Sequence, residues 1–120
     1  MGKRILVVDD SKAMRYILTV NLESFGYRVV EAEDGLDGLS KARINKFDLI
    51  LTDINMPNMN GYELIKCLRV EEKYQYIPIL AISTESCVTA KKQGKEAGAT
   101  GWIVKPFDPD KLESLIKRVL

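Results

Sequence analysis

Short runs of apolar residues recur along the chain, and each is followed by a stretch in which apolar residues repeat every three or four positions. The short runs predict buried strands, and the stretches predict helices with one apolar face. Their alternation is typical of βα units arranged around a parallel sheet that is covered on both sides. We expect five such units. The predicted strands cover residues 5–8, 29–30 with their neighbours, 49–51, 79–82 and 102–104, of which the second is the weakest and is expected at an edge.

The helical stretches have clear apolar stripes, with one exception. The exception covers residues 88–97, which contain few large apolar side chains, three lysines and Gly94 in the interior. An interior glycine costs a helix about 1 kcal/mol, so this helix is expected to be the least firmly docked. Two interpretations stay open: a poorly packed surface helix, or an element whose position a ligand can bias. The stripes of the other helices are Met14, Leu18, Leu22 and Phe25, ended by Gly26; Leu36, Leu39 and Ala42; Tyr62, Ile65 and Leu68; and Leu112, Leu115, Ile116 and Val119, begun by Asp108 and Pro109.

Composition narrows the class of protein. The chain has 120 residues, of which 46% are apolar, and 18 basic residues stand against 17 acidic ones, for a net charge of +1. This describes a single globular domain over residues 1–120, without the basic excess of a nucleic-acid or membrane-surface binder. The basic start at Lys3 and Arg4 is followed by only four apolar residues, too few for a secretory signal. We therefore expect a cytoplasmic protein that contacts neither nucleic acid nor membrane directly.

The chain contains no histidine, which excludes Ser/His/Asp and Cys/His catalysis and zinc sites that use histidine. Its two cysteines, Cys67 and Cys87, lack CxxC spacing. They are interpreted as free thiols that serve as small packing residues, with a redox pair as the less favoured alternative.

Polar residues collect where the predicted strands end. Asp9 and Asp10 follow the first strand and Asp53 follows the third. The fourth strand ends at Ser83 and Thr84, and the fifth at Lys105 and Pro106. Each alone has an ordinary explanation as a turn, a helix cap or a solvent-facing side chain. Because ligands of open α/β sheets bind beyond the carboxyl ends of the strands, their coincidence there predicts a functional site.

Three carboxylates this close repel one another unless a proton or a cation joins them. Mg²⁺ suits such a set, since it prefers carboxylate, carbonyl and water oxygens. Three carboxylates, one lysine and Mg²⁺ also sum to zero charge. These parts are suited to phosphoryl transfer, with Asp53 as the nucleophile, Asp9 and Asp10 holding the metal, and Lys105 and Ser83 meeting the phosphoryl oxygens.

Over essentially its whole length the sequence resembles the receiver domain of two-component response regulators, and most of all stand-alone chemotaxis regulators of the CheY type. The resemblance implies an α/β fold, a doubly wound five-stranded parallel sheet of order 2-1-3-4-5, flavodoxin-like, with helices on both faces. The motifs that carry it are Val7-Val8-Asp9-Asp10-Ser11; Asp53-Ile54-Asn55-Met56-Pro57 followed by Asn60-Gly61; Ser83-Thr84; and Lys105-Pro106-Phe107.

The resemblance also implies a role for each site residue. Asp53 would accept a phosphoryl group from a phosphohistidine on a sensor histidine kinase or phosphotransfer protein. Asp10, Asp53 and the main-chain carbonyl of Asn55 would bind Mg²⁺, with Asp9 acting through metal-bound water. Ser83 and Lys105 would contact the acyl phosphate, and the Lys105–Pro106 bond would be cis. Such a chain is a signalling phosphoprotein and not an enzyme acting on a separate substrate.

The implied output is a change of shape. Ser83 and its neighbour Thr84 would move toward the phosphoryl group, the fourth helix would adjust, and Trp102, where Tyr or Phe is commoner, would turn inward. Glu85 and Asn55 would tune the lifetime of the acyl phosphate. Trp102 can instead be only a half-buried edge-strand aromatic. The expected partner is a protein target, with the flagellar motor switch as the candidate, on the face made by the fourth helix, fifth strand and fifth helix.

Several alternatives remain at this point. A phosphorelay intermediate, or the isolated receiver of a longer response regulator, would show the same residues. A flavodoxin-like electron carrier would need a Ser/Thr/Gly-rich phosphate loop after the first strand, where Asp9 and Asp10 stand instead. A phosphatase of the haloacid dehalogenase type would place its nucleophile after the first strand, with a second acid two residues later. Here the candidate follows the third strand, and Asn55 lies two residues beyond it.

Overall fold

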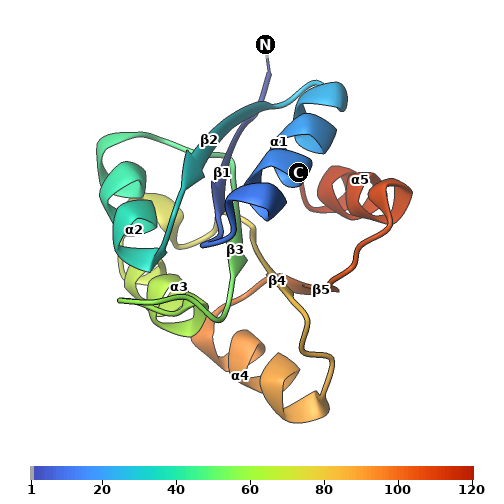
Figure 1. Cartoon of the computed structure of the whole chain (residues 1–120). Helices are drawn as coiled ribbons and strands as arrows, with labels where there is room; N and C mark the ends of the chain where they lie inside the picture. The colour runs from blue at the N-terminus through green and yellow to red at the C-terminus, as the bar shows by residue number, and fades with distance from the viewer. Residues whose placement is uncertain (1) are drawn as a thin grey trace.

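The structure, a computed structural model that describes residues 2–120, is a five-stranded parallel sheet between two layers of helices (Figure 1). The strand order β2-β1-β3-β4-β5 confirms the predicted fold class and places the weakest predicted strand at an edge. Met1, the first residue of the predicted domain range, lies outside the described residues. The strands are β1 (Arg4–Val8), β2 (Arg28–Ala32), β3 (Leu49–Asp53), β4 (Ile79–Ser83) and β5 (Gly101–Val104).

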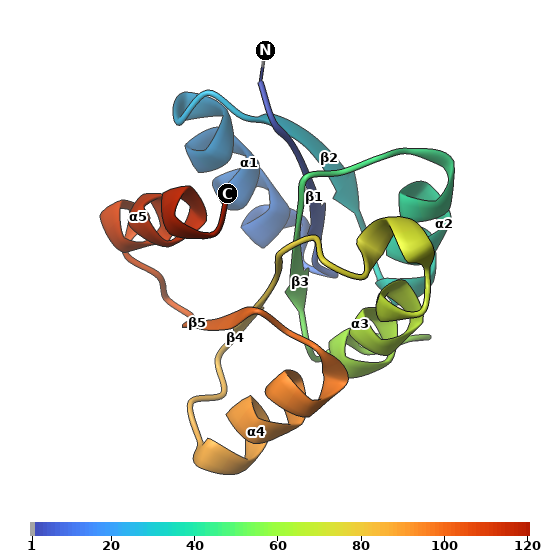
Figure 2. The ribbon, with the colours of Figure 1, turned by 180° about the vertical axis from the view of Figure 1, so that it is seen from behind.

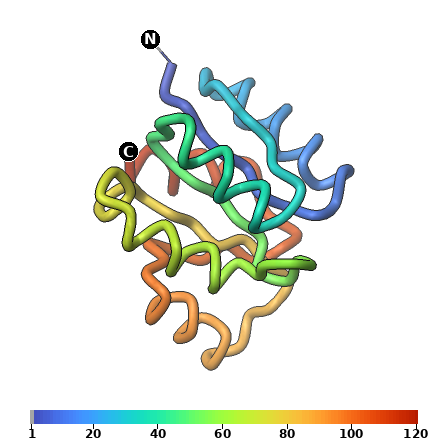
Figure 3. Tube along the Cα trace, turned by 90° about the vertical axis from the view of Figure 1, so that its left-hand side faces the viewer, coloured from blue at the N-terminus to red at the C-terminus, as the bar shows by residue number. Residues whose placement is uncertain are grey.

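The helices divide between the two faces of the sheet. Figures 1 and 2 show α1 and α5 on one face and α2, α3 and α4 on the other, and in Figure 3 the second group faces the viewer. None of the helices within residues 2–120 has the length and the apolar run that a bilayer crossing requires. The helices are α1 (Lys12–Ser24), α2 (Gly35–Ile44), α3 (Gly61–Arg69), the 3₁₀ turn η1 (Glu72–Tyr74), α4 (Val88–Ala97) and α5 (Pro109–Val119).

Two apolar cores follow from the alternation of side chains along the central strands. Ile5 and Val7 of β1 point into the core shared with α1 and α5. Leu6 and Val8 point into the core shared with α2 and α3. Because both faces are covered, a central strand needs a continuous apolar run, which is why the runs were visible in the sequence.

The helix ends match local sequence signals. Ser11, Asp34 and Asp108 accept main-chain N–H bonds at the starts of α1, α2 and α5. At the end of α1, Gly26 has φ of +97°, as its position predicted. Asn60 accepts the Glu63 N–H at the start of α3, so four of the five described helices have an ordinary polar cap. The fifth, α4, is capped by the sulfur of Cys87, which accepts from the Ala90 N–H at 3.4 Å.

Two expectations need correction. Leu36 was expected on the buried stripe of α2 but is 51% exposed. The buried side of that helix includes Gly38, where a Cβ would lie 2.9 Å from Val8, so the helix approaches β1 too closely for a larger residue. Cys87 is exposed and is therefore not a packing residue, whereas Cys67 packs against a core; both are free thiols.

The helix α4 has the predicted bounds and few large buried side chains, but Gly94 has a packing role that the sequence did not indicate. A Cβ on Gly94 would lie 2.8 Å from the ring of Trp102. The helix therefore rests on the indole through a small residue, and its buried residues are only Ala90, Gly94 and Ala97.

Candidate functional site

The carboxyl edge of the sheet brings three predicted acidic residues together. Asp9 and Asp10 follow β1, and Asp53 ends the adjacent strand β3, where Thr52 pairs with Val8. One carboxylate oxygen from each lies within 4.8 Å of the others. We call these three residues the acidic cluster. Asp9 and Asp53 are buried, and Asp10 is exposed.

Lys105 lies between the two buried carboxylates. Its Nζ donates to Asp9 Oδ2 at 3.0 Å and lies 3.4 Å from Asp53 Oδ2, and its side chain is only 12% exposed. The second oxygen of Asp9, Oδ1, accepts the Ser11 N–H at 2.8 Å. Both Asp9 oxygens are therefore already bonded within the protein.

The ionised form of the Asp53 carboxyl group is disfavoured by its surroundings. Burial, and next the charge of Asp9, raise the pKa of its carboxyl group. Lys105 and the hydrogen bond from the Ile54 N–H to Asp53 Oδ1, at 2.8 Å, act in the opposite direction but do not cancel the rise. An additional cation at the cluster would favour the ionised form.

The residues fit Mg²⁺. The cluster supplies only hard oxygen donors, and the carboxylate of Asp10 accepts no hydrogen bond from any residue within 2–120. A cation with oxygen ligands at about 2.1 Å separates opposite ligands by about 4 Å, close to the spacing of the cluster. Cys67 and Cys87 are not members of the cluster, so a thiolate metal is not indicated.

The loop between β3 and α3 turns back closely on the end of β3. The Gly61 N–H donates to the Ile54 carbonyl at 2.8 Å, and a Cβ at Gly61 would overlap the carbonyl oxygen of Asp53. Asn55 is exposed in this loop. Asn58, with φ of +69°, donates from its side chain to Asp34 Oδ2 at 2.9 Å, which ties the loop to the start of α2.

Ser83 lies at the same edge. Asp53 pairs in register with Ile82, so Ser83 is one residue beyond that pair. Its Oγ accepts the Glu85 N–H at 3.0 Å and its carbonyl accepts the Lys105 N–H at 2.7 Å. Its neighbours Thr84 and Glu85 are exposed.

Trp102 stands apart from the acidic cluster. Its Nε1–H donates to the Glu85 carbonyl at 2.9 Å, and its ring stacks on Tyr62 with centroids 6.4 Å apart. The Tyr62 hydroxyl in turn donates to the Ala90 carbonyl of α4 at 3.0 Å. The indole thus connects β5 with the loop before α4 and with α3. Pro106 is exposed, and its bond to Lys105 is cis, as the resemblance implied.

Sequence reasoning missed two polar residues at the site. Arg15 of α1 donates from a terminal nitrogen to the Asp9 carbonyl at 2.6 Å, and its Nε donates to Glu31 of β2 at 3.2 Å. These contacts depend on how α1 lies against β2, and no spacing in the sequence reports that.

Comparisons with known proteins agree on one family. Residues 5–117 match the model described as "Response regulator receiver domain". Protein PilH of Pseudomonas aeruginosa is 40% identical over 98% of this chain and 97% of its own. The alkaline phosphatase synthesis transcriptional regulatory protein PhoP of Bacillus subtilis is 39% identical over the whole of this chain, which spans 49% of that protein.

Solved structures agree as well. The chemotaxis protein CheY4 of Vibrio cholerae superposes with a TM-score of 0.96 and 42% identity over the whole of both chains. The receiver domain of the sensor histidine kinase PA1611 of Pseudomonas aeruginosa has a TM-score of 0.92 at 28% identity, over 98% of this chain and 97% of that one. That structure has a magnesium ion coordinated in its active site cleft.

Proposed function

Because the chain belongs to the response regulator receiver domain family, we propose that Asp53 accepts a phosphoryl group from a phosphohistidine. The donor is a sensor histidine kinase or a phosphotransfer protein. The donor histidine lies outside these 120 residues, which contain none. The observation that carries the proposal is the juxtaposition of the buried Asp53 with Asp9, Asp10 and Lys105 at one edge of the sheet. Membership of the family favours this function over an electron carrier or a phosphatase.

In the proposed step an oxygen of Asp53 attacks phosphorus, the bond from phosphorus to the imidazole nitrogen breaks, and the nitrogen keeps the electron pair. The product is an acyl phosphate on Asp53. Asp10, Asp53 and the Asn55 main-chain carbonyl would hold Mg²⁺, and Asp9 would act through water. Mg²⁺ supplies positive charge beside oxygens that carry negative charge during transfer. Lys105 and Ser83 meet the phosphoryl oxygens, and Lys105 offsets part of the added charge.

We infer a signalling role in the cytoplasm and no turnover of a separate substrate. The likeness to CheY4 supports a chemotaxis-type function with a protein target. A phosphorelay intermediate or the receiver of a longer regulator remains the alternative. The second has support from PhoP, of which the chain spans about half.

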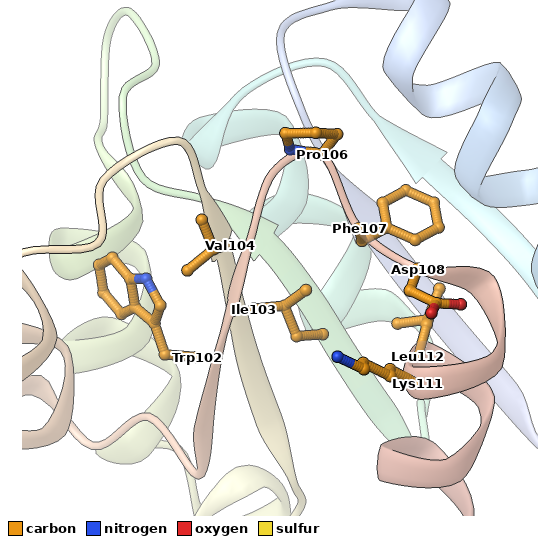
Figure 4. A pocket seen from close by; sticks show the side chains of 8 residues that line it. All are labelled: Trp102, Ile103, Val104, Pro106, Phe107, Asp108, Lys111 and Leu112. Atoms are coloured by element: carbon orange, nitrogen blue, oxygen red, sulfur yellow. The ribbon is translucent and has the colours of Figure 1, made fainter.

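The proposed target face is formed by α4, β5 and α5. Figure 4 shows one groove of this face, in which Ile103 and Val104 of β5 lie between Trp102 and Leu112 of α5. A second groove on the α4 side is lined by Lys91 and Lys95 beside the indole. Apolar side chains next to lysines suit a target segment with apolar and acidic residues. Trp102 of this face donates to the carbonyl of Glu85, which lies two residues beyond Ser83. Movement of Ser83 would therefore be transmitted to the target face through this hydrogen bond.

The proposed phosphorylation is tested by intact-protein mass after brief exposure to acetyl phosphate, with Mg²⁺ or with a chelator. We expect the wild type to gain one phosphoryl group only with Mg²⁺, and Asp53→Asn to gain none. Asp48→Asn is a matched control, because Asp48 lies just before β3 and binds the Arg4 N–H away from the cluster. Phosphoryl uptake by Asp53→Asn at the wild-type rate would refute the assignment. A folded wild type that gains nothing would indicate binding without phosphorylation.

A further inference from the structure

The peptide that joins Asp9 to Asp10 is held by a side chain from α1. Asp9 is bonded on every side: its N–H donates to the Ala32 carbonyl at 3.1 Å, and its carboxylate binds Ser11 and Lys105. Its carbonyl accepts from a terminal nitrogen of Arg15 at 2.6 Å. Since a peptide group is planar, a fixed Asp9 carbonyl also fixes the plane that leads into Asp10.

The orientation of the Asp10 side chain depends on the plane of the Asp9–Asp10 peptide. It is exposed, and its carboxylate accepts no hydrogen bond from the part of the chain that the structure describes. No side-chain partner within residues 2–120 therefore orients this carboxylate toward Asp53. The direction in which its Cα–Cβ bond leaves the main chain depends on the orientation of the preceding peptide, and the side chain bonded to that peptide is Arg15.

Arg15 is itself held in place by Glu31 of β2, a contact that we call the brace. Its Nε donates to Glu31 Oε1 at 3.2 Å, the Thr19 hydroxyl donates to Glu31 Oε2 at 3.0 Å, and the Arg15 side chain is 15% exposed. Lys41 of α2 donates to the Glu31 carbonyl at 2.6 Å, so the main chain at the brace is also fixed. Two nitrogens of one planar guanidinium thus donate to Asp9, just after β1, and to Glu31 of β2, which restricts the orientation of the guanidinium.

The brace also balances charge. Arg15 and Glu31 together add no net charge beside the acidic cluster. The guanidinium can therefore orient the peptide without greatly reducing the attraction of the cluster for a divalent cation.

We propose that Arg15, braced by Glu31, is a positioning residue for phosphotransfer, which orients the Asp9–Asp10 peptide so that Asp10 faces the cation. The proposal rests on the proposed function at Asp53. It assigns Arg15 an effect on cation affinity that acts through Asp10 and involves no contact of its own with the phosphoryl group.

The test compares Arg15→Lys, which keeps the charge but loses the forked geometry, with Arg15→Met, which loses both. Mg²⁺ affinity is measured by titration calorimetry, and unfolding temperature is measured with the metal chelated. We expect both variants to bind Mg²⁺ about tenfold more weakly, the lower end of losses seen when partners of metal ligands are removed. Phosphorylation by acetyl phosphate should recover at saturating Mg²⁺, which a general folding defect would not produce.

Arg43→Lys is the matched control. Arg43 also donates from Nε to a glutamate, Glu71, at 3.0 Å, but it lies in the last turn of α2, at the opposite end of the helix from the site. This variant should keep wild-type Mg²⁺ affinity. Glu31→Gln, which keeps Arg15 but weakens its brace, should reduce the affinity less than Arg15→Lys does.

Two outcomes would overturn the proposal. If Arg15 acts only as a charge, Arg15→Met will bind Mg²⁺ more tightly than the wild type and Arg15→Lys will match it. If Arg15 is only structural, both variants will unfold earlier with unchanged Mg²⁺ affinity. A wild type that binds Mg²⁺ but takes no phosphoryl group would refute the proposed function alone, because the affinities of the variants still decide the role of Arg15.

Discussion

Lys105 is the single side chain on which the electrostatics of the site depend most. Within residues 2–120 it is the only cation in contact with the buried carboxylates of Asp9 and Asp53. Asp9 has no exposed surface, so water cannot substitute for the lysine there. A buried charge is tolerated only while its partner is present.

Lys105→Met should therefore be strongly destabilising. Loss of one partner of a buried ion pair costs about 3–5 kcal/mol, and we expect about 3 kcal/mol because Asp53 can take up a proton. The pKa of Asp53, which Lys105 lowers, should rise further. Urea unfolding with the metal chelated measures the loss, and Mg²⁺ should restore part of it. Lys92→Met on the exposed surface of α4 is the control, and equal stability of the two variants would contradict the argument.

Sequence reasoning predicted that four polar residues would meet at one edge of the sheet, because each lies at the end of an apolar run. Asp9, Asp53, Ser83 and Lys105 could be placed at one edge from strand ends alone. The contacts of Arg15 could not be predicted, since they require the orientation of α1 against β2. The same limit applies to Leu36, which has the spacing of a buried residue but lies on the exposed side of α2.

At the scale of elements, α4 is held to the rest of the protein by an aromatic contact. The ring of Trp102 stacks on Tyr62 of α3, and Gly94 of α4 lies against the same ring. The helical pattern of residues 88–97 identified the glycine as a defect. It is a point of close approach, which only the partner on β5 explains.

Gly94→Ala tests this packing. Alanine favours a helix by about 1 kcal/mol over glycine, but its Cβ would lie 2.8–2.9 Å from the indole ring. Overpacking costs about 1–3 kcal/mol, so we expect a net loss of about 1 kcal/mol. Trp102 is the only tryptophan, so its displacement toward water should red-shift the fluorescence. The control is Lys95→Ala on the same helix. Increased stability with unchanged emission would show that the contact does not constrain α4.

The start of α2 is a second element whose stability depends on one carboxylate. Asp34 accepts the Asp37 N–H at 2.8 Å and the Asn58 side chain at 2.9 Å. The Asp37 hydrogen bond, and next the Asn58 hydrogen bond, lower the pKa of Asp34 below its usual value. The ionised form is therefore favoured in the folded state.

This gives a pH dependence of known sign. Because the folded pKa is depressed, the stabilisation is complete above the ordinary pKa of 3.8 and is lost as pH falls through the folded value. Asp34→Asn keeps a good cap and should cost only about 0.5–1 kcal/mol at neutral pH. Urea unfolding between about pH 3 and 7 gives the difference in unfolding free energy between the wild type and Asp34→Asn. We expect this difference to shrink only below about pH 4. Asn58→Gly, which suits the positive φ, should keep part of the pH dependence. A difference that is constant with pH would contradict the assignment.

At the scale of the whole molecule, burial is uneven. All five residues of β3 and β4 are buried, as are four of the five in β1, whereas the edge strands β2 and β5 are only partly covered. In α4, seven of ten residues are exposed. The acidic cluster therefore lies at the ends of two of the most firmly buried strands, and the proposed target face includes the largely exposed α4.

This uneven burial predicts that α4 opens locally at a lower free-energy cost than the central strands do. Amides in α4 need only local opening to exchange, while those in β1, β3 and β4 require opening of both cores. Hydrogen exchange followed by mass spectrometry should show α4 exchanging on the order of tenfold or more faster than the central strands. Mg²⁺, which would join the ends of β1 and β3, should slow exchange in the central strands and leave α4 almost unchanged. If α4 exchanged as slowly as β3, a rigid α4 would be indicated, and target binding could not then depend on its movement.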